Sequence, residues 1–384
     1  MKNILVVASH VEPNDHNGAS KYIKWIVSCI PSEFNVTVIS CGGKWQDIGT
    51  VMEIDSGHLD SKKIALVKSL FSKHPYHSYR LCNPKTIEYL QNEQINKYDL
   101  IIVSFIHSYI RLSPLLKSFD GKILVITHNY DPDIYSVWNR LNFIQKIISL
   151  LDSFKYKFAS HEPLLNNVMF AHVTESDRNK FTKIFPKVKH YIFPPPVPSS
   201  KSSETSIDDG VIRFCFIGSL ATSFNVEALE DFASCFWPTL RKMLKSEFFV
   251  FGSHPSKNVI SLCNDQGWEL KADLSDDELG KQIAKMDIGV MPFFKTAGTK
   301  LKLMHYFSAG CAVCCTSEFP EVFYNGKKIA ISSNDPNDWV IFSKEIQENR
   351  TSIKLTTRKA AQTEARNTKD CINSSILDVM SLPL

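Results

Sequence analysis

The sequence predicts an α/β protein with two domains, each built around a parallel β-sheet. The chain has 384 residues, a length that suits two domains of roughly 150 residues better than one. Short apolar runs alternate along it with amphipathic helical patterns, which is typical of parallel sheets covered by helices on both faces. A segment rich in proline and serine divides these runs into two series, and we place the domain boundary there.

The first domain is expected over residues 1–195. Its apolar runs are continuous rather than alternating, which is typical of strands buried on both faces. Helical patterns between them indicate the right-handed crossovers of a Rossmann-like layer. The expected strands are residues 4–8, 36–40, 100–105, 123–127, 170–174 and 190–193.

The second domain follows a linker at residues 196–210, where proline and serine favour an extended, polar connection. We expect this domain over residues 211–360 and a closing helix over residues 361–384. Helical patterns at residues 225–235 and 276–286 separate its first strands. The expected strands are residues 214–217, 248–251, 288–292, 312–316 and 329–332.

The composition excludes several classes of protein. With 43% apolar and 22% charged residues, the chain can bury a core, so disorder, collagen and coiled coil are set aside. A net charge of +4 is too small for nucleic-acid binding without a concentrated patch. Residues 1–200 carry 23 basic and 17 acidic side chains, so this half either faces an anionic surface or simply carries solvated lysines.

The ten cysteines are dispersed through apolar runs, which indicates small core residues in a reducing compartment. Cys311 and Cys314 have zinc-like spacing, but no second pair follows, and we expect no metal. The first residues contain too short an apolar run for a signal peptide, and no run is long enough to span a membrane. We therefore expect a cytoplasmic protein.

Three loops after strands are candidates for binding, because ligands of open α/β sheets bind beyond the carboxyl ends of the strands. The first contains Asn17, Gly18 and Ser20, just before a helical pattern. Free N–H groups at such a helix start can bind a phosphate. A turn followed by a helix cap explains the same residues.

The second loop begins with His128, at the end of the strand over residues 123–127. An imidazole there would point into the crevice, where it can form hydrogen bonds with hydroxyl or phosphate groups. Asp131 and Asp133 follow in a pattern that can hold a divalent cation. Because Pro132 between them fits a simple turn, we do not predict a metal.

The third loop follows the strand over residues 288–292. Gly298 and Thr299 are expected to open a helix, and Lys300 and Lys302 lie in its first turn. Lysines there oppose the helix dipole, an unfavourable arrangement that a bound anion would offset. The loop therefore predicts a diphosphate site, the alternative being a solvated basic helix start.

Four segments together resemble a known family. They are FIGSLATSFNVEALEDF at residues 216–232, GTKLKLMHYFSAGCAVCCTSEFPEV at 298–322, THNYD at 127–131 and LLNNVMFAHVTESDRNKF at 164–181. In this order they resemble the retaining nucleotide-sugar glycosyltransferases of the GT-B fold, of the group 1 type, which build bacterial surface polysaccharide and lipopolysaccharide. The segment at 298–322 is the most specific part, and the resemblance covers almost the whole chain.

The resemblance implies two Rossmann-like domains facing across a cleft, and transfer of a sugar from a nucleotide-diphosphate donor to a hydroxyl of a glycan or glycolipid. It implies retention of configuration. The start of the donor helix, with Lys300 and Lys302, can stabilise the departing diphosphate, so we expect no metal or other cofactor. Gly18 and its neighbours would lie near the acceptor and the phosphates, and His128 near the transferred sugar. The implied donor-binding residues are Gly218, Ser219, Gly298, Thr299, Lys300, Lys302 and His305.

The chain departs from the family at its pair of glutamates, whose positions hold Ala297 and His305. His305 can replace a ribose-binding carboxylate by a hydrogen bond, whereas Ala297 cannot contact the donor sugar. Two alternatives therefore stay open: a non-catalytic partner in glycan assembly and a nucleotide-sugar epimerase. Residues 140–158 are amphipathic and can either contact a membrane or pack on their own sheet.

Overall fold

The computed structural model describes residues 2–12, 18–41, 51–55, 57, 59–92, 95–128, 143–160, 165–198, 209–294 and 301–383. Their contacts divide the chain into two compact units. Met1–Pro196 and Asn367–Leu384 form the first, and Val197–Thr296 and Lys300–Arg366 form the second. The end of the chain thus belongs to the first unit. Its helix, α15 (Arg350–Ser381), also begins earlier than the expected closing helix at residues 361–384.

The first unit is built on a parallel sheet that has seven strands among the described residues, in the order β3-β2-β1-β4-β5-β6-β7. The six strands expected from the sequence are present, within a few residues of their expected bounds. The additional strand, β3, lies at the edge of the sheet, and its sequence VMEID lacks a continuous apolar run. The strands are β1 (Asn3–Val7), β2 (Asn35–Ser40), β3 (Val51–Asp55), β4 (Leu100–Ser104), β5 (Lys122–Ile126), β6 (Val168–His172) and β7 (Lys189–Ile192).

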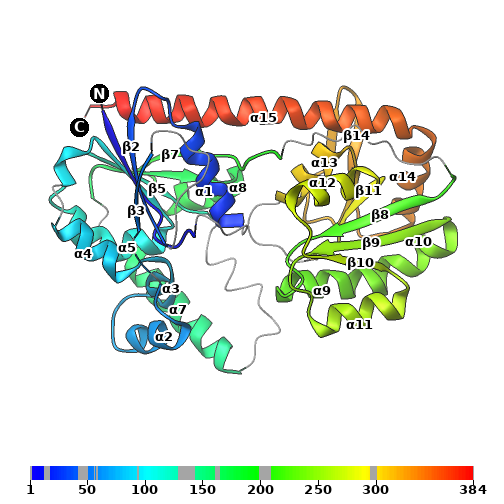
Figure 1. Ribbon diagram of the computed structural model, residues 1–384, viewed down its shortest axis with the longest axis horizontal. Helices are drawn as coiled ribbons and strands as arrows, with labels where there is room; N and C mark the ends of the chain where they lie inside the picture. Colours follow the sequence, from blue (N-terminus) through cyan, green and yellow to red (C-terminus); the bar gives the residue numbers. More distant parts are fainter. Residues whose placement is uncertain are drawn as a thin grey trace. The chain divides into compact units, whose positions relative to one another are not determined.

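Helices cover both faces of this sheet, because successive residues of a strand point to opposite faces. Ile4 and Val6 pack on the face covered by α1 (Gly18–Cys29) and the end of α15. Leu5 and Val7 pack on the opposite face with residues of the other helices (Figure 1). These helices are α4 (Pro84–Asn92), α5 (Ile106–Leu116), α7 (Phe143–Ser160) and α8 (Glu175–Ile184). A further helix, α3 (Tyr76–Leu81), packs against α5.

The end of α15 is part of the first unit's core. Ile372 and Ile376 are completely buried there. The ammonium group of Lys122 donates to the Met380 carbonyl at 3.1 Å, and the Tyr191 hydroxyl donates to Asp378 at 2.7 Å. This segment therefore completes a core whose other members come from the first 196 residues.

The second unit contains a seven-stranded sheet, counted over its described ranges, in the order β10-β9-β8-β11-β12-β14-β13. Its strands are parallel except β13, which pairs antiparallel with β14. The five expected strands are present, and the additional β10 and β13 lie at the two edges. The strands are β8 (Ile212–Ile217), β9 (Ser246–Gly252), β10 (Glu269–Ala272), β11 (Ile288–Met291), β12 (Ala312–Cys315), β13 (Val322–Tyr324) and β14 (Lys327–Ser332).

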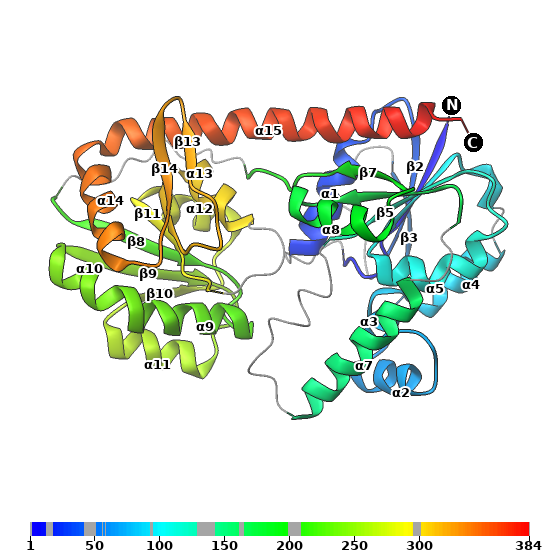
Figure 2. The same ribbon diagram turned by 180° about the vertical axis from the view of Figure 1, so that it is seen from behind.

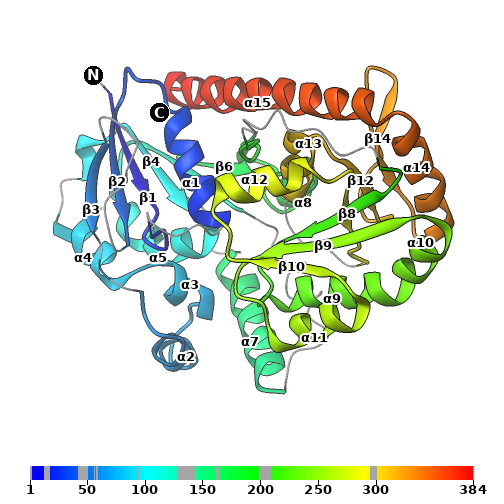
Figure 3. The same ribbon diagram turned by 45° about the vertical axis from the view of Figure 1, so that its right-hand side comes forward.

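Helices also cover both faces of this second sheet. Figure 3 shows α9 (Ser223–Asp231), α10 (Trp237–Met243) and α11 (Lys257–Gln266) on one face. The same view places α12 (Asp276–Ala284) and α13 (Leu301–Ala309) on the other. The helix α14 (Pro336–Glu348) packs against α10 and precedes α15.

Tyr306 fixes α13 on the sheet. Its ring lies so close to Gly289 that an added Cβ atom would approach the ring carbons to 2.3 Å. Its hydroxyl accepts from the Ile217 amide at 3.0 Å and donates to the Val290 carbonyl at 3.2 Å. This part of α13 is thereby held beside the carboxyl ends of β8 and β11.

The helix lengths and sequences also bear on membranes. In the part of the chain that the structure describes, no helix combines the length and the apolar composition that a membrane crossing requires.

Candidate functional site

Each sheet has one place where the chain leaves two neighbouring strands in opposite directions. In the first sheet it lies between β1 and β4, and in the second between β8 and β11. Open α/β sheets bind ligands beyond the carboxyl ends of the strands at such a switch point. The candidate functional residues of each unit are therefore sought there.

Two imidazoles and a hydroxyl meet at the first switch point. His10 follows β1, Ser104 ends β4 and His128 follows β5. The Ser104 hydroxyl lies 2.8 Å from Nε2 of His128 and 3.4 Å from Nε2 of His10. The His128 ring also stacks on Phe105, with 3.7 Å between ring centroids. His128 is thus held by a hydrogen bond at its edge and by an aromatic ring on its face.

The backbone at this place is strained. Phe105 has φ 69° and His128 has φ 57°, values in the left-handed region that side chains with a Cβ atom rarely adopt. Such conformations persist only where the surrounding structure holds them, and they concentrate at functional sites. The strain supports the choice of His128 as a candidate residue and adds Phe105 beside it.

Both imidazoles are neutral at physiological pH. Burial lowers the pKa of His10 to about 3 and lowers the pKa of His128 well below its usual range. A neutral imidazole has one donor nitrogen and one acceptor nitrogen. The cluster can therefore form hydrogen bonds with sugar hydroxyls, but it supplies no fixed positive charge.

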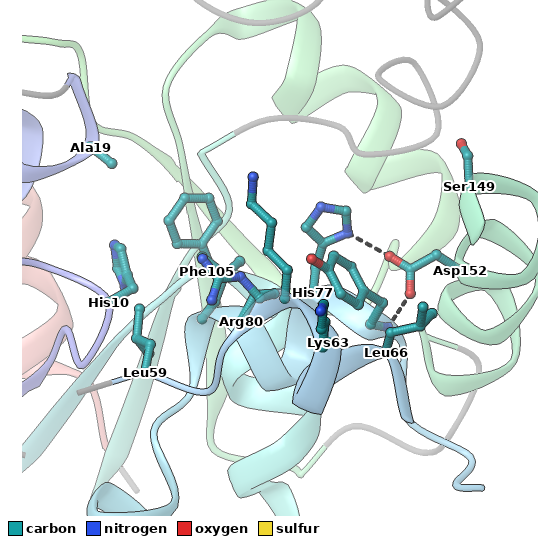
Figure 4. Close-up of a pocket in the computed structure, with 13 residues that line it drawn as sticks. His10, Ala19, Leu59, Lys63, Leu66, His77, Arg80, Phe105, Ser149 and Asp152 are labelled. Atoms are coloured by element: carbon teal, nitrogen blue, oxygen red, sulfur yellow. Dashed lines mark hydrogen bonds and ion pairs between the residues drawn. The ribbon is translucent and has the colours of Figure 1, made fainter. Parts of the chain in front are cut away.

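A pocket of about 700 Å³ opens beside this cluster, within the first unit. Figure 4 shows its labelled side chains arranged from His10 at one end to Asp152 and Ser149 at the other. The volume lies in the range of small-molecule sites. Its lining residues come from the strand ends, α1, α2 (Lys62–Leu70), α3 and α7: His10, Ala19, Leu59, Lys62, Lys63, Leu66, Tyr76, His77, Arg80, Leu81, Phe105, Ser149 and Asp152.

Hydrogen bonds join the helices that form the pocket wall. Nδ1 of His77 lies 2.5 Å from Oδ2 of Asp152, and Oδ1 of the same carboxylate accepts from the Tyr76 amide. The Lys155 ammonium group donates to the Ser69 carbonyl, which joins α7 to α2. Figure 2 shows α7 and α2 side by side. The pocket is therefore a built cavity between connected helices.

At the second switch point, a lysine, an asparagine and a glycine lie together. The ammonium group of Lys302, in the first turn of α13, donates to Oδ1 of Asn225 at 2.5 Å. Asn225 is buried and donates to the Ser219 carbonyl at 2.8 Å. A Cβ atom added to Gly218 would lie 3.0 Å from Nζ of Lys302. Three residues implied by the resemblance, Gly218, Ser219 and Lys302, are thus brought together.

The surroundings of Lys302 are apolar. Its ammonium group lies 4.4 Å from the ring centroids of both Phe216 and Phe293. Desolvation lowers the pKa of Lys302 well below its usual range, while the ring faces partly compensate the charge. Lys302 is therefore packed among side chains at the second switch point and is not a solvated basic residue at a helix start. An anion beside it would favour its charged form.

The remaining expected residues are distributed as follows. Gly18 is the first residue of α1 and is exposed, whereas Ser20 is buried. His305 lies half-buried on α13, where its carbonyl accepts from Ser308. Asn17, Asp131, Asp133, Ala297, Gly298, Thr299 and Lys300 lie outside the described residues.

Sequence reasoning missed His10, Ser104, Phe105, Asn225 and the basic residues of the pocket. His10 carried a usable signal, since it follows a buried strand closely, as His128 does. No group of three or more His, Cys, Asp and Glu side chains in the described ranges is placed to hold a metal ion.

Comparisons with known proteins point to one family and one fold. Residues 212–347 match the family model described as Glycosyl transferases group 1. No curated protein sequence matches the chain. Among solved structures, a sucrose-phosphate synthase from Thermosynechococcus elongatus is 12% identical, with a TM-score of 0.67 over 99% of this chain and 98% of that one.

Two further solved structures match over nearly the whole chain. WaaG, a glycosyltransferase involved in lipopolysaccharide biosynthesis, is 12% identical, with a TM-score of 0.62 over 99% of this chain and 100% of that one. Anabaena HepE, in complex with UDP-glucose, is 12% identical, with a TM-score of 0.63 over the same shares. At these identities the likeness concerns the fold alone.

Proposed function

We propose that this chain, which has the GT-B fold and whose residues 212–347 match the Glycosyl transferases group 1 model, transfers a sugar from a nucleotide-diphosphate donor. The acceptor is a hydroxyl of a glycan or glycolipid of the bacterial surface, and the configuration is retained. The observation that carries the proposal is the cluster of Gly218, Asn225 and Lys302 at the second switch point.

The second unit binds the donor in this proposal. When the bond between the sugar and the diphosphate breaks, negative charge develops on the departing phosphate oxygen. The bound diphosphate favours the charged form of Lys302, whose pKa burial lowers in the free protein. The ammonium group then stabilises the developing charge at a site where apolar rings exclude water. The missing side chain of Gly218 leaves room for Asn225 and for the Lys302 ammonium group beside the backbone. Thr299 and Lys300 are assigned to the same group from the sequence alone.

His128 positions the transferred sugar. Its neutral ring donates or accepts a hydrogen bond at a sugar hydroxyl, and Ser104 and Phe105 hold its orientation. In the overall reaction, the acceptor oxygen bonds to the anomeric carbon as the bond to the diphosphate breaks. The proton of the acceptor hydroxyl passes to the departing diphosphate, so no metal or redox cofactor is needed for balance.

The first unit contacts a membrane surface in this proposal. The helix α7 packs inward through Asp152 and Tyr156, yet Leu150 is 74% exposed. Phe71, which directly follows α2, is 87% exposed. Exposed apolar side chains on helices that also carry exposed lysines are typical of peripheral membrane contact. Such contact would bring a lipid-linked acceptor to the protein from the cytoplasmic side.

A flotation assay with vesicles containing anionic lipid tests this contact. Phe71→Ser combined with Leu150→Ser should reduce the bound fraction several-fold, because the inserted apolar area is lost. Ile260→Ser, which alters an exposed residue of α11, serves as the matched control and should bind like the unaltered protein. Equal binding by all three proteins would remove membrane contact from the proposal.

Two experiments separate the proposed activity from its alternatives. Mass spectrometry after incubation with nucleotide sugars distinguishes a transferase, which needs an acceptor, from an epimerase, which alters the donor alone. Thermal unfolding with a series of nucleoside diphosphates tests for a non-catalytic partner. A ligand at one hundred times its dissociation constant adds about 2.7 kcal/mol to stability, and no shift with any nucleotide would favour the partner.

A further inference from the structure

The pocket of the first unit carries an excess of positive charge. Lys62 and Lys63, at the start of α2, and Arg80, on α3, all line it. Asp152 is the one carboxylate among the described lining residues. Its side chain is 1% exposed and is paired with His77, so it leaves no acidic group to balance the two lysines.

The neighbouring acidic residue does not neutralise these lysines either. Asp60 pairs with Lys68, one of its oxygens lying 2.9 Å from the ammonium group. Lys62 and Lys63 have no ion-pair partner within the described part of the chain. Their position in the first turn of α2 also opposes the helix dipole. This arrangement does not stabilise the helix, and an anionic ligand in the pocket would offset it.

Arg80 adds a donor group to the same wall. Its guanidinium donates to the Asp60 carbonyl, which fixes the orientation of the side chain. A guanidinium has five N–H donors in a planar fork that suits the oxygens of phosphate or carboxylate. The orientation thus leaves further donors of a fixed group available to the pocket.

The rest of the lining suits the carbon skeleton of a sugar. Leu59, Leu66 and Phe105 provide apolar surface, and His10 contributes a neutral imidazole whose Nδ1 has no hydrogen-bond partner in the described structure. A buried nitrogen of this kind is costly unless a ligand pairs with it. The pocket therefore has cationic side chains at one end, apolar side chains that can contact a sugar ring, and an imidazole that can form a hydrogen bond with a sugar hydroxyl.

We infer that this pocket binds the acceptor, and that the acceptor carries an anionic group, a phosphate or a carboxylate, which pairs with Lys62, Lys63 and Arg80. The inference rests on the proposed function, which assigns the donor to the second unit. It narrows the substrate class from any glycan hydroxyl to a hydroxyl of an anionic sugar or of a phosphate-linked lipid.

Calorimetry on the full chain tests the inference with defined probes: glucose 6-phosphate, glucuronate and glucose. An anionic sugar should bind at least about tenfold more tightly than glucose, because charge-assisted hydrogen bonds to three cations are involved. Lys62→Ala combined with Lys63→Ala should abolish this preference. Lys117→Ala, which alters an exposed lysine at the end of α5, is the matched control and should retain it.

A lipid arm distinguishes the two sources of the anionic group. If the group belongs to a lipid, a short-chain phosphatidylglycerol kept monomeric, so that no membrane surface is present, binds through Lys62 and Lys63, and the soluble sugars do not. If it belongs to a soluble sugar, glucose 6-phosphate or glucuronate binds through the same lysines. Failure of every anionic probe to bind, or binding that ignores the double substitution, would overturn the inference.

The outcome is separable from that of the proposed function. Nucleoside diphosphate binding tests the second unit, and the double substitution in the first unit should leave that affinity unchanged. Nucleotide binding without a preference for anions refutes the pocket assignment alone. Anion binding without nucleotide binding refutes the proposed donor and leaves the pocket's anion preference standing.

Discussion

At the switch point of the first sheet, the Ser104 hydroxyl joins two neutral imidazoles, whereas at that of the second sheet Lys302 places an ammonium group beside Gly218. Burial lowers the pKa of all three groups, but the consequence for binding differs. It leaves His10 and His128 neutral and suited to hydroxyl groups. It disfavours the charged form of Lys302, which an anion beside it would restore. In the proposed function, the first switch point therefore contacts sugar hydroxyls and the second contacts the diphosphate.

The largest expected effect is on turnover. His128→Ala should lower the rate of sugar transfer by about a hundredfold, in the range for a lost positioned hydrogen-bonding group, while nucleoside diphosphate affinity stays within about twofold. His128→Asn keeps a donor and an acceptor and tolerates the left-handed backbone, so it should recover part of the rate. Steady-state kinetics and calorimetry measure the two quantities, and unchanged turnover in His128→Ala would exclude this residue from the site.

The next effect is on stability in acid. Burial lowers the pKa of His10 and of His172 to about 3, so each must gain a proton on unfolding below its usual pKa. The free energy of unfolding is therefore unaffected by these two groups above pH about 6.5, and it decreases as the pH falls towards 3. At pH 5 each should cost about 2 kcal/mol. Hydrogen exchange should show the first unit opening before the second, and equal loss in both would contradict the comparison.

A smaller effect concerns nucleotide affinity. Lys302→Met should weaken nucleoside diphosphate binding about tenfold, since one charge-assisted contact to the diphosphate is lost. The protein should remain as stable or become more stable, because methionine fills the space between Phe216 and Phe293 without a desolvated charge. Lys281→Ala, at an exposed position of α12, is the control. Unaltered affinity in Lys302→Met would separate this lysine from the donor.

The smallest effect is a pH dependence of the same binding. The pKa of Lys302 is lowered in the free protein, and a bound diphosphate should raise it, so binding takes up a proton. Affinity should therefore fall a few-fold between pH 7 and pH 9, where the diphosphate itself no longer titrates. Calorimetry in buffers of different ionisation enthalpy detects the proton. A Lys302→Met protein with the same pH dependence would refute this origin.

The central strands could be predicted from the sequence, because strands buried on both faces need long apolar runs. The strands β3, β10 and β13 could not be predicted, because they lie at sheet edges and are short or carry charged residues, as in VMEID and ELKA. Right-handed crossovers and strand order then account for both switch points. The antiparallel pairing of β13 had no signal in the sequence.

The candidate site was predictable only where one strand end determined it. His128 and Gly218 could be found because each follows a recognisable buried strand. The relation of His10 to Ser104 depends on β1 and β4 being neighbours, although nearly a hundred residues separate these side chains in the chain. Lys62, Lys63 and Arg80 line a pocket because α2 and α3 are tied to α7 by contacts such as His77 with Asp152, which no local pattern encodes.

The shared helix α15 has a practical consequence for dissecting the molecule. Its first turns are fastened to the second unit, where Lys354 donates to the carbonyls of Ala284 and Met286. Its final turns contribute Ile372 and Ile376 to the core of the first unit. A fragment that ends at residue 196 would expose the apolar surface that the end of α15 covers, so we expect it to aggregate. Co-expression with a peptide spanning residues 367–384 should restore its solubility.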